Sequence, residues 1–148
     1  EDQGWVAWFL IAAVTGRPIT IYGDGKQVRD VLNVSDLLNA YDAAIEKIDV
    51  ARGQVYNMGS EQGNYTKDQI VALILQRLPE TTVQYKDMTF GGDMRDISVS
   101  FEKIHRELGF QTTLTIDDGV REVLNALRTG MIRDPKDERY RNAQFIVQ

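Results

Sequence analysis

The first apolar segment of the chain predicts a helix. Residues 5–15 are almost continuously apolar, and Gly16 and Pro18 follow directly. Glycine closes helices, and a proline close behind cannot continue one, so we expect the helix to end at about residue 15. The segment is also too short to cross a bilayer, which needs roughly 20 apolar residues. We therefore expect a helix packed against other elements.

Two short extended segments follow, with a glycine-rich break between them. Residues 19–22 and 28–34 have the pattern of strands, and Gly23-Asp24-Gly25 between them is a turn signal. The simplest interpretation of the two glycines is a hairpin turn that joins the two strands. A polar residue, Ser35, then precedes a run of apolar residues at helical spacing, and we expect it to cap a helix.

The second half of the chain alternates strand and helix signals. Residues 54–58 form a candidate buried strand, residues 82–85 a second strand, and residues 97–99 a weak third one. Thr66 with Gln69 forms a capping box ahead of a helix that Pro79 ends. Two more helices are expected, with these boundaries: Ser100 to Gly109, and Thr115 to Gly130.

These elements predict a mixed α/β fold (α+β) without a complete Rossmann domain. A dinucleotide-binding turn needs glycines between a strand and a helix, so that the backbone approaches the pyrophosphate. Gly23 and Gly25 lack a third glycine at the required spacing and lead into a strand-like segment. At 148 residues the chain accommodates one domain or a fragment of a larger one. Because it begins at Glu1, we expect a piece of something longer.

Composition excludes several classes of protein. Hydrophobic residues make up 43% and charged residues 26% of the chain, which is typical of a soluble globular protein. There are no cysteines and one histidine, so thiolate chemistry and a multi-histidine metal site are excluded. A net charge of -5 argues against nucleic-acid binding. We expect a cytoplasmic protein with no membrane and no nucleic-acid partner.

The run from Ile19 to Leu32, with Gly23-Asp24-Gly25-Lys26-Gln27-Val28-Arg29-Asp30 at its centre, resembles a known family. It is similar to the C-terminal, substrate-binding part of the extended short-chain dehydrogenases/reductases, the NAD-dependent nucleotide-sugar epimerases and dehydratases. The resemblance implies that Tyr22 borders the nucleotide base and that Arg29 grips the diphosphate, a task that suits its planar fork of donors. The alternatives are strand packing for Tyr22 and an ion pair with Asp30 or Asp36 for Arg29.

The start of the chain carries a second resemblance. Asp2-Gln3-Gly4-Trp5-Val6 is most similar to the CDP-paratose 2-epimerases of this family, in which such a segment opens a helix beside the substrate diphosphate. Gln3 and Trp5 are thus implied as substrate contacts, at a helix end whose free N–H groups suit an anion. Trp5 and Trp8 could instead be core or interface residues.

A third resemblance lies in the segment Asp93-Met94-Arg95. In the family, an acidic residue here meets the ribose and an arginine meets phosphate, which implies these roles for Asp93 and Arg95. Many relatives have arginine where Phe90 stands and aspartate where Ser100 stands, so the second phosphate contact rests on Arg95 alone. The alternative is a salt bridge within a loop. Residues 55–60 resemble the strand that returns to the cofactor-domain sheet.

No catalytic, cofactor-binding or metal-ligating residue is expected in this chain. The family uses a tyrosine and a lysine four positions apart on one helix face. Tyr22 and Lys26 have this spacing, but the glycines between them make a helix implausible. The resemblance implies NAD(P) for the full-length family, and we do not expect this chain to bind it alone. His105 is expected at the surface.

The sequence leads to two functional hypotheses. The first is the nucleotide-sugar-binding C-terminal half of an NAD-dependent epimerase or dehydratase, inactive without its missing N-terminal Rossmann half, with a domain fragment over 1–130 and a charged tail over 131–148. The second is a non-catalytic binding module that forms a homo-oligomer through its uncovered apolar faces. Its expected interface residues are Trp5, Trp8, Phe9 and the strand around Tyr56.

Overall fold

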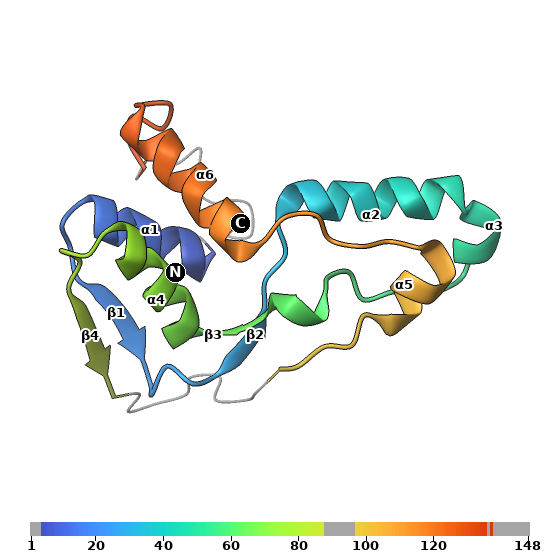
Figure 1. Ribbon diagram of the computed structural model, residues 1–148, viewed down its shortest axis with the longest axis horizontal. Coiled ribbons are helices and arrows are strands. Elements are labelled where there is room, and N and C mark those ends of the chain that lie inside the picture. The colour runs from blue at the N-terminus through green and yellow to red at the C-terminus, as the bar shows by residue number, and fades with distance from the viewer. Residues whose placement is uncertain (1–3, 88–96, 136, 138–148) are drawn as a thin grey trace, which may run out of the picture.

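The computed structural model describes residues 4–87, 97–135 and 137 of the chain. Within these ranges, helices alternate with short strands, which confirms the mixed α/β fold. Figure 1 shows one end of the molecule built from α1, α4, α6, β1 and β4, and the other from α2, α3 and α5. The bounds are α1 Trp5–Val14, β1 Ile19–Tyr22, β2 Val28–Asp30, α2 Val34–Glu46, α3 Ile48–Ala51, a 3-10 helix η1 Glu61–Gly63, β3 Asn64–Thr66, α4 Lys67–Arg77, β4 Val83–Lys86, α5 Glu102–Leu108 and α6 Ile116–Arg128.

Helix α1 forms where the apolar segment predicted it. Leu10 is 1% exposed, because the helix is apolar almost all round and packs on α4, α6 and β1. The helix ends at Val14, and Gly16, two residues later, has a left-handed conformation with φ +68°. The sequence predicted that this glycine ends the helix. No helix in the described ranges is long and apolar enough to cross a membrane.

The two sheets correct the predicted hairpin between residues 19–22 and 28–34. β1 pairs in parallel with β4, with Ile19 opposite Val83, whereas β2 pairs antiparallel with β3, with Arg29 opposite Tyr65. The Gly23–Gly25 turn therefore passes the chain from one sheet to another. The reason is tertiary: β1 and β4 bury Ile19 and Ile21 against α1 and α4, a pairing that no local pattern in the sequence shows.

Two clusters of buried side chains form the core. The larger joins α1, β1, α4 and α6, and includes Leu10, Ile19, Ile74 and Val120. The smaller lies between α2 and α5, where Ala40 packs with four residues: Phe101, Ile104, Leu108 and Phe110. Asp36 of α2 is fully buried and accepts hydrogen bonds from the segment before α6, which connects the two clusters.

Several predicted boundaries change by a few residues. Asn33 caps α2, its Oδ1 accepting from the Ser35 N–H at 2.8 Å, so the prediction of Ser35 as the cap is wrong. The two residues compete for the same role, and Asn33 has the extended backbone that a cap needs. α5 begins after Phe101 rather than Ser100, and it ends as predicted at Gly109, which has φ +70°.

Two predicted strands are not formed. Residues 54–58 and 97–99 are irregular, and Val55 is 83% exposed. A strand needs a neighbour to complete its backbone hydrogen bonds, and of these two segments only 97–99 makes such a contact among the described residues, a single bond from the Ile97 N–H to the Val28 carbonyl at 3.3 Å, which does not form a ladder. The capping box of Thr66 with Gln69 and the start of α6 at Thr115 are confirmed, and Thr115 forms a capping box with Asp118.

Candidate functional site

The Gly23–Gly25 turn is held by its own aspartate. Both glycines have positive φ, +86° and +75°. Between them, Asp24 Oδ1 accepts from the Lys26 N–H at 3.0 Å and from Gln27 Nε2 at 3.3 Å. An aspartate that accepts from the backbone two residues ahead forms an Asx turn, which fixes the direction of the chain locally. The sequence Gly-Asp-Gly therefore sets how β1 leads into β2.

The start of α4 fixes the same turn from outside. The Asp68 N–H donates to the Gly25 carbonyl at 3.1 Å, and the Tyr85 hydroxyl donates to Asp68 Oδ1 at 2.9 Å. A Cβ on Gly25 would lie 2.0 Å from Asp68 Oδ1, so another residue here would have to displace the Asp68 carboxylate and also adopt a positive φ. The turn, α4 and β4 thus form one connected unit that positions the residues on either side of the turn.

Tyr22 lies at the last position of β1, directly before the turn. Its side chain is 50% exposed, and β1 presents alternating buried and outward positions, with Tyr22 on the outward side. Its carbonyl accepts from Lys67 Nζ at 3.5 Å. Ordinary strand packing thus leaves Tyr22 half exposed, and an exposed tyrosine is accessible to a ligand.

Arg29 lies in the middle of β2, on the other side of the turn. It is half-buried, and its Nη1 donates to the Val28 carbonyl at 2.8 Å. The sequence suggested Asp30 and Asp36 as ion-pair partners of Arg29. The carboxylate of Asp36 accepts hydrogen bonds from Thr113 and Leu114. Asp30 points toward Gly59 and Gly63, because a Cβ on either glycine would lie 3.2 or 3.1 Å from its Oδ1.

Asp30 is an unusual carboxylate next to this site. Burial raises its pKa above the ordinary value, and a hydrogen bond from the Val31 N–H acts in the opposite direction. Its Oδ1 is buried and has no hydrogen-bond partner in the described structure. Folding therefore disfavours the ionised form, because burial removes more of its hydration than the hydrogen bond from the Val31 N–H replaces.

Lys67 is a cation at this site that the sequence did not single out. It is the first residue of α4, and its ammonium reaches back to the Tyr22 carbonyl. Burial lowers the pKa of Lys67, the positive charge of Arg29 lowers it further, and Asp24 raises it. Arg29, Lys67 and Asp24 are thus close enough to interact electrostatically. In the sequence, Lys67 is distinguished only by its position directly after the helix cap Thr66. A lysine at such a position is ordinarily a surface residue, so the sequence did not point to it.

Trp5 occupies the first turn of α1. Its ring meets the edge of Phe9 at 5.5 Å between centroids and an interplanar angle of 74°, so it packs within its own helix. Trp8 is 46% exposed and lies under the Arg17 guanidinium, 5.3 Å from the ring centroid. Three of the residues implied as substrate contacts, Gln3, Asp93 and Arg95, lie outside the described residues, as do Phe90 and residues 138–148.

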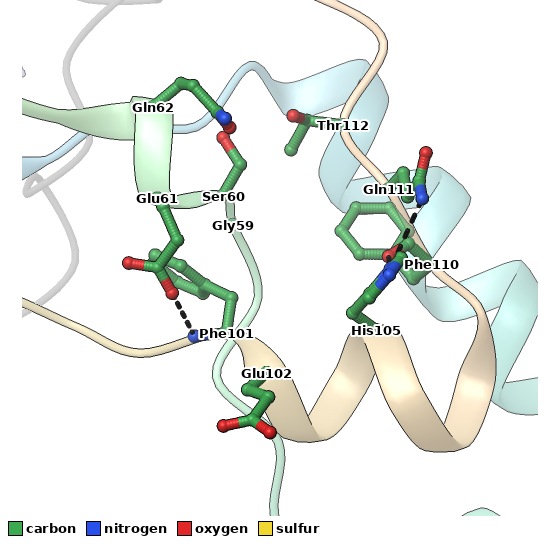
Figure 2. A pocket seen from close by; sticks show the side chains of 10 residues that line it. All are labelled: Gly59, Ser60, Glu61, Gln62, Phe101, Glu102, His105, Phe110, Gln111 and Thr112. Carbon is green, nitrogen blue, oxygen red and sulfur yellow. Dashed lines mark hydrogen bonds between the residues drawn. The ribbon is translucent and has the colours of Figure 1, made fainter.

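A pocket of about 460 Å³ lies at a different place, between η1 and α5. Figure 2 shows the side chains that surround it, with Phe101 below Glu61 on one side and His105 beside Phe110 on the other. His105 Nδ1 lies 3.4 Å from both the Phe110 carbonyl and Gln111 Nε2. His105 is exposed, as predicted. None of Tyr22, Arg29 and Trp5 lines this pocket, so it is separate from the site around the turn.

The Gly23–Gly25 turn lacks the geometry of a pyrophosphate-binding turn. The one pair of close glycines, Gly23 and Gly25, leads into β2 rather than into a helix, so no helix N-terminus faces it as pyrophosphate binding requires. Tyr22 and Lys26 lie on a strand and in a turn, as expected, and not on one helix face. No group of three or more metal-ligating side chains occurs in the described ranges.

The architecture is that of part of an extended short-chain dehydrogenase/reductase. Superposition on the dTDP-glucose 4,6-dehydratase of Bacillus anthracis, solved in complex with NAD, gives a TM-score of 0.73 at 27% identity, and covers 87% of this chain and 40% of that one. The sequence of residues 1–59 matches the model of the NAD dependent epimerase/dehydratase family. The chain belongs to this family.

Two curated relatives extend the similarity beyond residue 59. The CDP-paratose 2-epimerase of Salmonella typhi is 29% identical over 128 residues, which are 82% of this chain and 38% of the relative. The dTDP-glucose 4,6-dehydratase of Haemophilus influenzae is 37% identical over 124 residues, 76% of this chain and 36% of the relative. The chain therefore spans well under half the length of the relatives that it matches.

Proposed function

We propose that this chain binds the nucleoside diphosphate part of a nucleotide sugar at the Gly23–Gly25 turn. In this proposal Arg29 binds phosphate and Tyr22 borders the base. The observation that carries it is the fixed turn, which holds a half-exposed aromatic ring on one side and a guanidinium on the other. A flat apolar group next to a bidentate cation matches a base next to a diphosphate.

The relatives support a nucleotide sugar as the ligand. Their names describe enzymes that act on CDP-linked and dTDP-linked sugars. Because a fold hosts many functions, the argument rests on the residues at the turn as well as on the family. We extend the proposal to Trp5 at the start of α1, and to Gln3, Asp93 and Arg95, as further contacts to the substrate.

The chemistry of the proposed parent activity is epimerisation or dehydration of the sugar. NAD supplies hydride transfer in such an enzyme, and the cofactor needs a fold that the described residues do not provide. We propose that NAD(P) binds to a segment of the family that this chain does not match, and that the chain alone is a substrate-binding part without turnover. Its own residues bind and orient the diphosphate.

Titration calorimetry with CDP, UDP, GDP and dTDP tests this function. We expect one nucleotide to bind with micromolar affinity and the matching nucleoside without phosphate to bind at least tenfold more weakly, because phosphate contacts carry much of the affinity. We expect no heat from NAD. Equal affinity for nucleoside and nucleotide would contradict the role of Arg29, and binding of NAD would contradict the assignment of the cofactor to another segment.

A second proposal is that the chain associates through a face of α2 and α3. Six exposed apolar residues lie here, the first five of them three or four positions apart, and we call them the α2–α3 face: Val34, Leu38, Tyr41, Ile45, Ile48 and Val50. Large exposed apolar patches mark interaction surfaces. The interface first expected comprised Trp5, Trp8, Phe9 and the strand around Tyr56, and of these Trp8 is 46% exposed. Phe9 is 4% exposed, and the Tyr56 hydroxyl donates to Glu107 Oε2 at 2.9 Å.

Two partners suit the α2–α3 face, and solution mass distinguishes them. A second copy of this chain would give a homo-oligomer. A Rossmann domain supplied by the N-terminal part of a relative would instead bind a monomer and cover the face, since helices commonly pack on the faces of such a sheet. We propose the homo-oligomer for the chain alone, because an uncovered apolar face favours self-association.

A further inference from the structure

We propose that the pocket between η1 and α5 is a second binding site, and that its ligand is a neutral, hydroxyl-rich ring such as a free monosaccharide. The volume of about 460 Å³ lies in the range of pockets that hold small molecules. Phe101 and Phe110, which are 4% and 6% exposed, close the pocket on the side of the core. The other side chains of its wall are polar.

Three of these polar side chains have no partner within the part of the chain that the structure describes. Ser60 and Gln62 lie on one side of the pocket, and Thr112 lies on the other (Figure 2). Hydroxyl and amide groups both donate and accept hydrogen bonds. A ligand with several hydroxyl groups matches them, because each of its hydroxyls also donates and accepts.

The charge of the pocket opposes a phosphate ligand. Two carboxylates, Glu61 and Glu102, line it, and no lysine or arginine does. The cations of α5 are engaged elsewhere. Lys103 donates to the segment after α3, and Arg106 pairs with Glu107 at 2.9 Å and faces Glu102 at 3.8 Å. The ligand of this pocket therefore differs in class from the diphosphate proposed for the turn.

The same carboxylates favour a neutral donor over an ammonium ion. Glu102 already faces Arg106, and Glu61 Oε1 accepts from a backbone N–H at 3.3 Å. His105, the other titratable side chain of the wall, lies with Nδ1 3.4 Å from the Phe110 carbonyl. Carboxylates near the surface attract a cation weakly, because water and salt screen them, whereas they accept hydrogen bonds from hydroxyl groups directly.

Strand β2 separates this pocket from the Gly23–Gly25 turn. Asp30 points toward Gly59 in the pocket wall, since a Cβ on Gly59 would lie 3.2 Å from Asp30 Oδ1. Adjacent residues of a strand point to opposite faces, so Arg29 points away from the pocket. The two sites lie on different faces of β2, and a ligand in one should leave the other free.

Calorimetry with D-glucose, D-galactose and D-mannose tests the class of ligand. We expect at least one to bind with about millimolar affinity, as a small neutral molecule does. The 6-phosphate of the tightest sugar should bind about threefold to tenfold more weakly, because the carboxylates repel it. Tetrahydropyran-2-methanol, which has the ring without its hydroxyls, should bind about tenfold more weakly or less tightly still.

Three outcomes of this titration overturn the proposal. Silence toward all three sugars removes the ligand class. Equal affinity for tetrahydropyran-2-methanol shows that the hydroxyls are not recognised. Tighter binding of the 2-amino derivative than of the parent sugar, by about tenfold, shows a site for a cation instead.

Two variants with matched controls locate the sugar. Thr112→Val keeps the shape of the side chain and removes its unpartnered hydroxyl, so affinity should fall about threefold or more at an unchanged melting temperature. Thr81→Val, at a half-buried threonine before β4 with no side-chain hydrogen bond, should change neither. Glu61→Gln keeps an oxygen for the backbone N–H and should reduce the discrimination against the 6-phosphate. Glu80→Gln, between α4 and β4 at the other end of the molecule in Figure 1, should preserve it.

NMR of the backbone amides separates this proposal from the proposed function. Sugar-induced shifts at residues 59–62 and 110–112 support the pocket, whereas shifts confined to residues 22–29 overturn it. Arg29→Ala should bind the sugar as the wild-type chain does, and loss of sugar binding in this variant would contradict two separate sites. The sugar is titrated without nucleotide, so a chain that binds no nucleotide overturns the proposed function alone.

Discussion

Asp36 of α2 and Thr113 are joined by both the backbone and the side chain of the threonine. Asp36 Oδ1 accepts from the Thr113 N–H at 3.0 Å and from Thr113 Oγ1 at 2.8 Å, and its Oδ2 accepts from the Leu114 N–H at 3.0 Å. The carboxylate is fully buried. It ties α2 to the segment that leads into α6, so it connects the two core clusters.

Replacing Asp36 with alanine should destabilise the fold by about 2–4 kcal/mol, because the N–H groups of Thr113 and Leu114 would lose their acceptor and the fully buried site of the carboxylate would be left empty. Urea unfolding followed by circular dichroism measures this. Asp42→Ala is the matched control, since Asp42 is an exposed aspartate on the same helix, and its replacement should change stability by less than about 0.5 kcal/mol. Equal losses in the two variants would contradict the assigned role of Asp36.

The same carboxylate predicts how stability depends on pH. Burial alone would raise the pKa of Asp36, but the hydrogen bonds from Thr113 and Leu114 outweigh it, and the net pKa lies below its ordinary value of 3.8. A carboxylate whose pKa is lower in the folded state stabilises the fold above its unfolded pKa, and this contribution is lost as pH falls through the folded pKa.

We therefore expect the chain to lose stability below about pH 4, the ordinary range of an aspartate. Asp36→Asn should be less stable at pH 7 and should show a smaller further loss on acidification. Thermal unfolding of both proteins between pH 7 and pH 2.5 measures the difference. Parallel melting curves across this range would show that Asp36 does not titrate with folding.

Gly25→Ala tests whether α4 fixes the turn. Gly25 has φ +75°, and a Cβ here would lie 2.0 Å from Asp68 Oδ1, so alanine brings both backbone strain and a steric clash. Gly16→Ala is a close control, because Gly16 has φ +68° with no atom within 4 Å of the added Cβ. We expect a loss of about 1 kcal/mol for Gly16→Ala and of about 2–4 kcal/mol for Gly25→Ala.

Urea unfolding distinguishes the two glycine variants. Both glycines have a positive φ, so both variants lose stability for that reason. The additional loss of unfolding free energy in Gly25→Ala therefore measures the clash with Asp68. The variant should also bind nucleotide more weakly, since the turn positions Tyr22 and Arg29. Equal costs at Gly16 and Gly25 would mean that the start of α4 yields easily and does not fix the turn.

Self-association through the α2–α3 face is tested by Leu38→Asp combined with Ile45→Asp. Both side chains are exposed, at 59% and 67%, so the charges should leave the monomer folded while they oppose burial of the face. We expect light scattering to show an oligomer for the wild-type chain and a monomer for the double variant. An oligomer that persists in the variant would place the interface elsewhere.

The sequence predicted the helices whose ends are set by neighbouring residues, such as a capping side chain or a terminating glycine. The apolar run with Gly16 gave α1, and Thr66 with Gln69 gave the start of α4. The predicted hairpin failed because the partner of β1 is β4, more than 60 positions away, with Ile19 opposite Val83. Such pairing depends on the shared core of α1 and α4, and no turn signal between β1 and β2 reports it.

The candidate site was predictable in part. Tyr22 and Arg29 were found through their resemblance to a family segment, and the structure places them on either side of one fixed turn. Lys67 was missed because its contact with the Tyr22 carbonyl joins residues 45 positions apart in the chain, which no local pattern in the sequence shows. Gln3, Asp93 and Arg95 remain predictions, since they lie outside the described residues.

The most direct test of the proposed function is the affinity of the wild-type chain and of Arg29→Ala for the same nucleoside diphosphate. Loss of a charged, bidentate contact to phosphate should weaken binding by about tenfold to a hundredfold, while affinity for the nucleoside without phosphate stays the same. We expect this difference in calorimetry at matched ionic strength. Binding of nucleotide with the same affinity by both proteins would contradict the central claim, because the diphosphate would then be held without Arg29.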